Sequence, residues 1–175
     1  MGAAGVLVGM ETSGYHLAQF NVGRTVAPMD SGEMAGFRDG LAVINGLADR
    51  TPGFVWRLVG EAADDATDLR LPGTDLIMNL SVWESRQALW DFVYRSAHLD
   101  YLRRRRDWFQ KLGTPIQVLW WLPAGTLPDI AEAKRRLELL TAGGPGPDAF
   151  TFREFHEAPA PGPDAGQAEP VNAGR

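Results

Sequence analysis

The chain contains no cysteine among its 175 residues. This absence excludes disulfide bonds, thiolate metal ligands and a cysteine nucleophile. Histidine is scarce as well, because the three histidines are widely spaced and none belongs to a His-x-x-x-His pair. We therefore expect no metal site. A glycine-rich loop between a predicted strand and a predicted helix is also missing, so the sequence has no signature of a nucleotide cofactor.

The chain also has fewer positive than negative charges and no long apolar run. The 22 acidic residues outnumber the 17 basic ones, which gives a net charge of -5. Nucleic-acid binding requires clustered positive charge, so we expect no nucleic-acid partner. The longest apolar stretch, residues 117–124, is much shorter than the roughly 20 residues that a membrane span requires. We therefore expect no membrane partner and a cytoplasmic protein.

The length and composition favour a single domain with loose ends. A chain of 175 residues that is 45% hydrophobic can bury one good core. Residues 158–175 are rich in proline, glycine and alanine and have little to bury, so we predict a disordered tail there. Residues 1–14 are predicted to be a flexible N-terminal extension. The folded domain is therefore expected at residues 15–157.

Segments of strand and helix character alternate through this domain. Short apolar segments rich in β-formers predict four strands, at residues 15–22, 54–59, 76–83 and 116–122. Helical spacing of apolar residues predicts helices at residues 33–48 and 129–140. The segment 84–109, which lacks glycine and proline, predicts one long helix or two helices joined near Ser96. The order βαββαβ with an extra C-terminal helix is that of a ferredoxin-like α+β fold.

The predicted strands have two different faces. One face is apolar in three strands, and we assign this face to the helices. The opposite face carries amides and indoles, which suit a ligand cavity with a mainly apolar wall and a few placed polar groups. We expect helices on one face only, so a second copy of the chain should cover the other. The sequence therefore predicts a homodimer that forms an α+β barrel around a pocket for a small hydrophobic molecule.

His98 is the leading candidate for a catalytic residue, because imidazole transfers protons near neutral pH. On a continuous helix it would share one ridge with Tyr94, so the two side chains are candidates for an acid and a base. The alternative is that His98 satisfies a helix end near Ser96. Asn79 and Asn21 are candidates for polarising a carbonyl or holding an oxyanion. A buried asparagine can equally bond only to neighbouring backbone.

Further side chains on the mixed face are candidates for binding substrate. Trp83, Trp121 and Gln117 lie on this face, and either Trp56 or Arg57 turns towards it. An indole offers a large flat wall with one N–H donor. The alternative is that the tryptophans belong to the core and to the dimer interface.

A run of four arginines, Arg103 to Arg106, covers every side of a helix, so at least one of them must point towards protein. Arg106 is our candidate for binding an acidic group of a ligand. A solvated helix face or salt bridges between subunits would explain the run as well.

Six segments that recur in order carry a resemblance to a known family. They read HLAQFNVGR at 16–24, PGFVWRL at 52–58, NLSVWES at 79–85, FVYRSAH at 92–98, RRRRDWF at 103–109 and LWWLPAG at 119–125. Together they resemble the DUF3291 family. That family is similar to the dimeric α+β barrel group, which includes antibiotic-biosynthesis monooxygenases, polyketide cyclases, lactone isomerases and haem-binding enzymes. The resemblance implies the barrel fold and leaves the reaction open.

Three functions are compatible with these residues and this resemblance. The first is a small enzyme of specialised metabolism that uses no cofactor and cyclises, isomerises or oxygenates a hydrophobic, polyketide-like molecule. In it, His98 and Tyr94 would act as acid and base while Asn79 or Asn21 polarises a carbonyl. The second function is haem binding, with His98 as the axial ligand. The third is non-catalytic binding of a metabolite.

Overall fold

The computed structural model describes residues 14–61 and 65–160. The predicted extension and tail lie outside this part of the chain, except for Gly14 and residues 158–160. The order of elements agrees with the sequence prediction, with the long helical segment divided into three. The elements are β1 (Tyr15–Gly23), α1 (Ala35–Asp49), β2 (Phe54–Arg57), β3 (Ile77–Trp83), α2 (Arg86–Arg95), α3 (His98–Arg103), α4 (Arg105–Trp108), β4 (Gln117–Pro123) and α5 (Ile130–Gly143).

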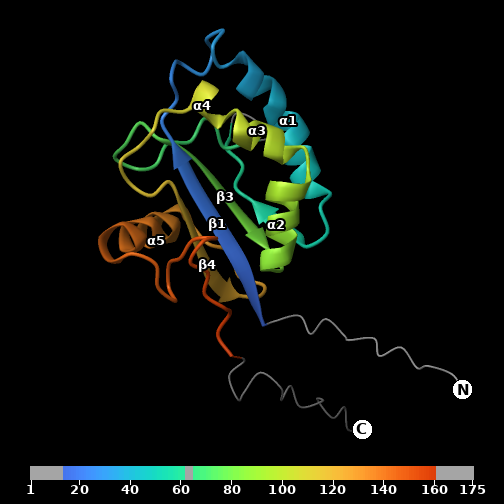
Figure 1. Ribbon diagram of the computed structural model, residues 1–175, viewed down its shortest axis with the longest axis vertical. Helices are drawn as coiled ribbons and strands as arrows, with labels where there is room; N and C mark the ends of the chain where they lie inside the picture. Colours follow the sequence, from blue (N-terminus) through green and yellow to red (C-terminus); the bar gives the residue numbers. More distant parts are fainter. Residues whose placement is uncertain (1–13, 62–64, 161–175) are drawn as a thin grey trace, which may run out of the picture.

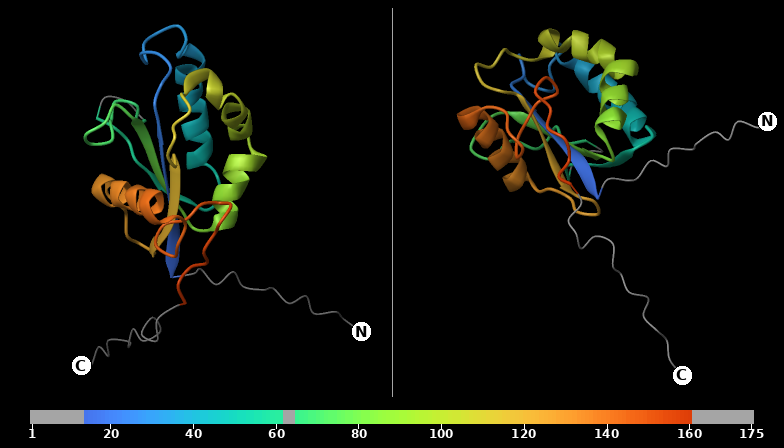
Figure 2. Two further views of the ribbon diagram at one scale, coloured as in Figure 1. Left: turned by 60° about the vertical axis from the view of Figure 1, so that its left-hand side comes forward. Right: turned by 60° about the horizontal axis from the view of Figure 1, so that its bottom comes forward.

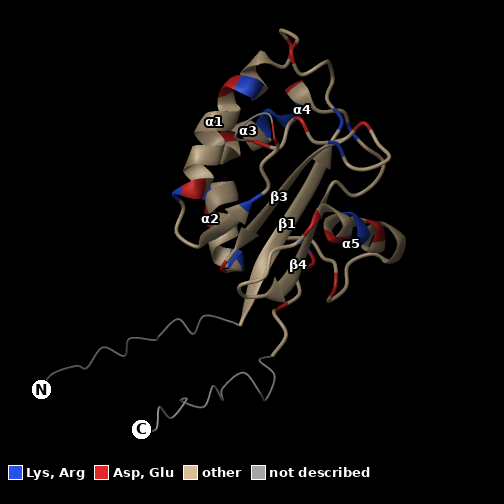
Figure 3. Cartoon of the chain, turned by 180° about the vertical axis from the view of Figure 1, so that it is seen from behind, with Lys and Arg blue, Asp and Glu red and all other residues tan. Residues whose placement is uncertain are grey.

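The four strands form one antiparallel sheet in the order β2-β3-β1-β4. This order, with α1 after the first strand and α2 to α4 after the third, confirms the ferredoxin-like α+β fold. Strands β1, β3 and β4 contain no charged residue (Figure 3), so both faces of the sheet centre can be covered. In the described residues, no helix has the length and apolar character needed to cross a membrane.

Helices cover both faces of the sheet, which corrects the expectation that they cover only one. Figure 2 shows α5 on one side of the strands and α1 to α4 on the other. The evenly apolar face packs against α5, where Val118, Trp120 and Leu122 share a buried cluster with Leu137 and Leu140. Our assignment of this face to the main helices is therefore wrong. Homodimer formation stays a prediction, although α1 to α4 cover the mixed face that the sequence analysis reserved for a partner, and α5 and the loop after β2 cover part of the opposite face.

The mixed face lies beneath α1 to α4. Its buried cluster joins Leu17 of β1 and Trp83 of β3 to Leu89, Phe92 and Val93 of α2. The C-terminal segment closes the same cluster, because Phe150 is fully buried and exchanges two backbone hydrogen bonds, of 2.8 and 2.9 Å, with Leu119. This face therefore combines a packed end with the polar end described below.

Local side-chain hydrogen bonds set where the helices begin and break. Ser85 and Asp129 act as N-caps of α2 and α5 and accept hydrogen bonds from the backbone N–H groups of Ala88 and Glu132. At the end of α2 the Ser96 hydroxyl donates to the Phe92 carbonyl at 2.5 Å and accepts from the His98 N–H at 3.1 Å. The chain therefore turns at Ser96, as one of the two sequence alternatives predicted.

The second strand is shorter than predicted and irregular. It ends at Arg57 instead of Val59, and its register against β3 shifts between Phe54 and Trp56. Such a bulge places two residues opposite one and reverses the facing of the later residues in the strand. Arg57 consequently pairs with Ser81 on the mixed face, and Trp56 packs into the cluster beneath α5.

Candidate functional site

A cavity of about 340 Å³ lies between the mixed face of the sheet and the helices α1, α2, α3 and α4. Most of its lining is apolar or aromatic, with a limited number of polar side chains. This is the composition expected of a small-molecule site, and the volume is near the lower end of the usual range of roughly 300–1,000 Å³. The lining residues belong to one chain, and the dimeric barrel that the sequence predicts around the pocket stays a prediction.

Three amide side chains form a row across the sheet beneath this cavity. Asn21 of β1 is paired in register with Asn79 of β3 on one side and with Gln117 of β4 on the other. All three line the cavity. Side chains directly opposite each other in antiparallel strands lie close together, so the row presents several N–H donors and carbonyl acceptors to one region of the cavity.

The next row along the sheet is buried and satisfied internally. Gln19 and Ser81 are each 6% exposed, and the Ser81 hydroxyl lies 3.3 Å from the Gln19 carbonyl oxygen, to which it donates. The same hydroxyl accepts from the Trp83 indole N–H at 3.0 Å. These bonds fix the orientation of the Trp83 ring, which is 1% exposed and lines the cavity.

His98 enters the cavity from the start of α3. Its ring lies 4.8 Å from the ring of Phe92, which in turn stacks on Trp83 at 5.0 Å. The Nδ1 atom is 3.4 Å from the Val93 carbonyl oxygen. Because a carbonyl can only accept, Nδ1 carries the proton and the neutral ring keeps its lone pair on Nε2.

Burial governs the protonation of His98. It lowers the pKa of the imidazole below its ordinary value, and the hydrogen bond to the Val93 carbonyl offsets this only in part. The imidazole is therefore neutral at physiological pH, with an unprotonated nitrogen available as a base.

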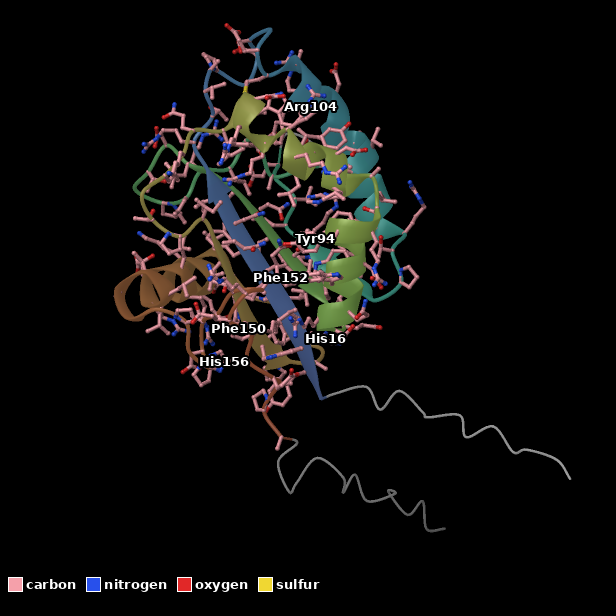
Figure 4. The ribbon with its side chains drawn as sticks, in the orientation of Figure 1. His16, Tyr94, Arg104, Phe150, Phe152 and His156 are labelled. Atoms are coloured by element: carbon pink, nitrogen blue, oxygen red, sulfur yellow. The ribbon has the colours of Figure 1, made fainter. Side chains whose placement is uncertain are left out.

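Tyr94 lies away from the cavity, contrary to the expectation that it pairs with His98. The break at Ser96 ends the ridge that would have joined them. The Tyr94 ring lies 4.3 Å from Trp90 and 5.8 Å from Phe152. Figure 4 labels Tyr94 and Phe152, which lie near each other. Tyr101, one turn after His98, lines the cavity instead. The sequence contained this signal, because Tyr101 is three residues from His98.

Two predicted tryptophans also lie outside the cavity lining. Trp56 packs beneath α5, and the Trp121 indole N–H donates to the His156 carbonyl at 2.8 Å in the C-terminal segment. Arg57 lines the cavity in place of Trp56, but it forms a double hydrogen bond with Asp49 at 2.9 and 3.3 Å. Of the predicted substrate-binding residues, the structure brings together Asn21, Trp83 and Gln117, with Asn79 and His98 beside them.

Arg105 is the arginine of the run that lines the cavity, whereas the prediction named Arg106. Arg106 is exposed and is not part of the lining, whereas Arg105 is partly buried and lines the cavity. Arg103 and Arg104 are exposed and form ion pairs with Asp100 and Asp107. The sequence required one inward arginine but could not say which.

Metal ligands do not gather in the described residues, where no group of three or more His, Asp or Glu side chains has a suitable arrangement. Haem binding stays an untested alternative. Among the described lining residues, His98 is the only histidine and would have to supply the axial ligand.

Comparison with known protein families identifies the chain. The model of the family described as "Domain of unknown function (DUF3291)" matches residues 16–164. The chain belongs to the DUF3291 family. The motif-based resemblance is thereby confirmed, and the cavity residues from Gln19 to Gln117 all lie within the matched part of this DUF3291 protein. None of the curated proteins matches it.

Solved structures with related architecture are distant from this DUF3291 chain. SnoaB, a cofactor-independent oxygenase from Streptomyces nogalater, shares 19% identity over 66% of this chain and 96% of its own, with a TM-score of 0.34. The ActVA-Orf6 monooxygenase from Streptomyces coelicolor, determined with nanaomycin D, shares 14% over 67% and 95%, with a TM-score of 0.35.

A dabb family protein with a ferredoxin-like fold, from Mesorhizobium loti, is also similar. It shares 13% identity over 65% of this chain and 99% of its own, with a TM-score of 0.38. None of these three TM-scores reaches 0.5, so the description of the fold rests on the strand order of this chain itself.

Proposed function

We propose that this protein is a small enzyme without a bound cofactor that performs proton transfer on a hydrophobic, enolisable, polyketide-like molecule held in the cavity. Cyclisation and isomerisation follow directly from such a step, and oxygenation follows if dioxygen is the co-reactant. The observation that carries the proposal is the neutral imidazole of His98 in a cavity that also contains the row of amides.

The proposed step moves one proton and leaves the electron pair on the substrate. Nε2 of His98 takes a proton from the carbon next to a carbonyl, and the C–H electrons pass into the enolate. An amide N–H of Asn79 or Asn21 stabilises the charge on the enolate oxygen. Return of the proton to another carbon completes an isomerisation. In a cyclisation the enolate carbon attacks a second carbonyl, the C=O π electrons move to its oxygen, and this alkoxide takes the proton back from His98.

The aromatic walls support a flat hydrophobic substrate. Trp83 is held edge-on by Phe54, with ring centroids 5.2 Å apart, and is stacked on Phe92 from α2. Because these rings are fixed by packing and by the bond to Ser81, they form a rigid base under the cavity that need not be ordered when a ligand binds.

Deuterium exchange at C1 of 2-tetralone, followed by NMR in D2O, tests this proposal with a simple enolisable bicyclic ketone. We expect the wild-type protein to accelerate exchange and His98→Gln to lose roughly 100-fold or more, because general-base catalysis has this size. Glutamine retains a hydrogen bond but cannot accept the proton near pH 7. Asn79→Ala should lose about tenfold or more.

His156→Gln is the matched control, because His156 lies in the C-terminal segment outside the cavity lining. It should exchange at the wild-type rate. Binding of 2-tetralone, followed by tryptophan fluorescence, with exchange at the buffer rate would favour the non-catalytic metabolite-binding alternative and overturn the catalytic proposal. A Soret band in the purified protein that disappears in His98→Gln would favour haem binding instead.

A further inference from the structure

Arg105 is a cation in the cavity without a countercharge among the described residues. Arg103 and Arg104 lie at the surface and pair with aspartates three residues away. The Arg105 side chain has no hydrogen bond or ion pair with any described residue, and its closest ring contact is Phe109, with the guanidinium carbon 5.9 Å from the centroid. Burial lowers the pKa of Arg105 from its ordinary value, so keeping this charge in the cavity destabilises the folded chain.

The other charged side chains of the cavity already have partners. Arg57 is neutralised by the double hydrogen bond to Asp49. The Asp65 carboxylate accepts from the backbone N–H and the hydroxyl of Thr67. His98 is neutral because of its burial. Among the described lining residues, Arg105 is therefore the cation that is left without a partner.

Arg105 lies at the end of the cavity beyond the amide row. Phe109, four residues after Arg105, packs on Gly23 so closely that a Cβ there would lie 2.6 Å from the ring. Gly23 is two residues after Asn21 on the same strand face. A backbone hydrogen bond of 2.9 Å from Val26 to the Trp108 carbonyl holds α4 against the chain that leaves β1, and Figure 1 shows α4 beside that end of β1.

The two ends of the cavity are therefore chemically different. His98, Phe92 and Trp83 form an aromatic end with a neutral base. Arg105 forms a positively charged end, and the amide row lies between the two ends, because Asn21 stands on β1 between Leu17, which pairs with Trp83, and Gly23, which packs on Phe109. A ligand that satisfies both ends has an apolar ring system at one extremity and an anionic group at the other.

We propose that the substrate class of this cavity is an aromatic or fused-ring organic acid, whose carboxylate is bound by Arg105 beyond the amide row while its rings occupy the apolar part of the cavity towards His98. This inference rests on the proposed function only in taking the cavity as the ligand site. A guanidinium suits a carboxylate because its N–H groups match the two oxygens in one plane. Binding of the anion would also remove the destabilising effect of the unpaired charge.

A matched pair of probes tests the inference, namely 2-naphthoate and the neutral 2-naphthamide, with binding measured by tryptophan fluorescence and calorimetry at pH 7.5. We expect the wild-type protein to bind the carboxylate at least about tenfold more tightly than the amide, given the usual strength of hydrogen bonds to charged groups. Arg105→Gln should abolish this preference and leave amide binding unchanged. Arg105→Lys should retain part of it.

The controls separate this inference from a structural role for Arg105. Arg103→Gln removes the same charge from an exposed position, so the preference should persist. The melting temperature of ligand-free Arg105→Gln should equal or exceed that of the wild type, because the variant removes a desolvated cation. A fall of several degrees would show that Arg105 stabilises the fold and would overturn the inference.

The remaining binding results are also decisive. Equal wild-type affinity for the two probes, or a preference that survives in Arg105→Gln, would overturn the acid substrate class and leave the proton-transfer proposal standing. Failure of the wild type to bind either probe would overturn both, because the cavity would then not be a site for fused-ring ligands.

Discussion

The imidazole of His98 links the chemistry of the cavity to the stability of the fold. Its pKa is lowered by burial, with the Val93 carbonyl as the only other contributor and no charged side chain involved. The unfolded chain therefore binds a proton on His98 near the ordinary value of about 6.5, while the folded chain binds it only at lower pH. Between these two values the unfolded state holds more protons, so stability is lost as the pH falls through 6.5.

We predict that the free energy of unfolding falls more steeply in the wild type than in His98→Gln when the pH is lowered from 7.5 to 5. Urea unfolding at several pH values measures this difference. The other two histidines are common to both proteins, so their contributions cancel in the comparison. Equal slopes for the two proteins would mean that His98 titrates as freely in the folded chain as in the unfolded one.

Some cavity residues could be predicted from the sequence because of the chemistry of their side chains. Others could not, because their placement depends on breaks in the helices and on a bulge in a strand. His98 could be predicted as a cavity residue from the chemistry of its side chain, and Asn79 and Gln117 could be predicted from their amide groups together with strand alternation. Arg105 was not recognisable, because the helix breaks at Ser96 and again at Arg104, and each break resets the phase that decides which arginine points inward. In the same way, the bulge in β2 places Arg57 on the mixed face and Trp56 on the opposite face.

At the scale of elements, the contact between α1 and α3 depends on a residue without a side chain. Gly40 of α1 is buried beneath the ring of Tyr101, and a Cβ at this position would overlap the ring atoms. The close approach of the two helices sets the position of Tyr101 and, through α3, of His98. The glycine that allows this close approach has a poor helix propensity, which weakens α1 locally.

We predict that Gly40→Ala lowers the free energy of unfolding, because overpacking costs roughly 1–3 kcal/mol and outweighs the gain of about 1 kcal/mol in helix propensity. Gly46→Ala is the matched control in the same helix, since the nearest atom to its new Cβ is the end of the flexible Arg50 side chain. It should stabilise the protein slightly. Urea unfolding of both variants measures the difference, and a Gly40→Ala protein as stable as Gly46→Ala would contradict the packing argument.

Element order could be predicted from the sequence, but the layering of elements could not. Hydrophobic alternation distinguishes the two faces of a strand without saying which helices cover each face. The more apolar face was assigned to the main helices, whereas those helices cover the polar face. They can do so because Ser81, Gln19 and Trp83 satisfy one another and because the amide row borders a cavity instead of packed side chains.

At the scale of the whole molecule, the dimer remains the central prediction. The family resemblance implies a pair of subunits, and large apolar side chains such as Leu127 and Leu139, just before and on α5, are 54% and 43% exposed. We predict a particle of twice the 19.1 kDa chain mass at micromolar concentration. Light scattering coupled to size exclusion measures this mass, and a particle of single-chain mass would rule out the dimeric barrel.

The residues that line the cavity determine how many ligands such a pair of subunits would bind. Because residues of the sheet, of α1 to α4 and of the loop after β2 in a single chain line the cavity, we predict that each subunit of a dimer carries its own site. Binding should then saturate hyperbolically at one ligand per chain. A mixed pair of one intact and one inactivated subunit should then keep half of the turnover of the intact pair, and a much lower turnover would show that each subunit supplies a residue to the site of the other.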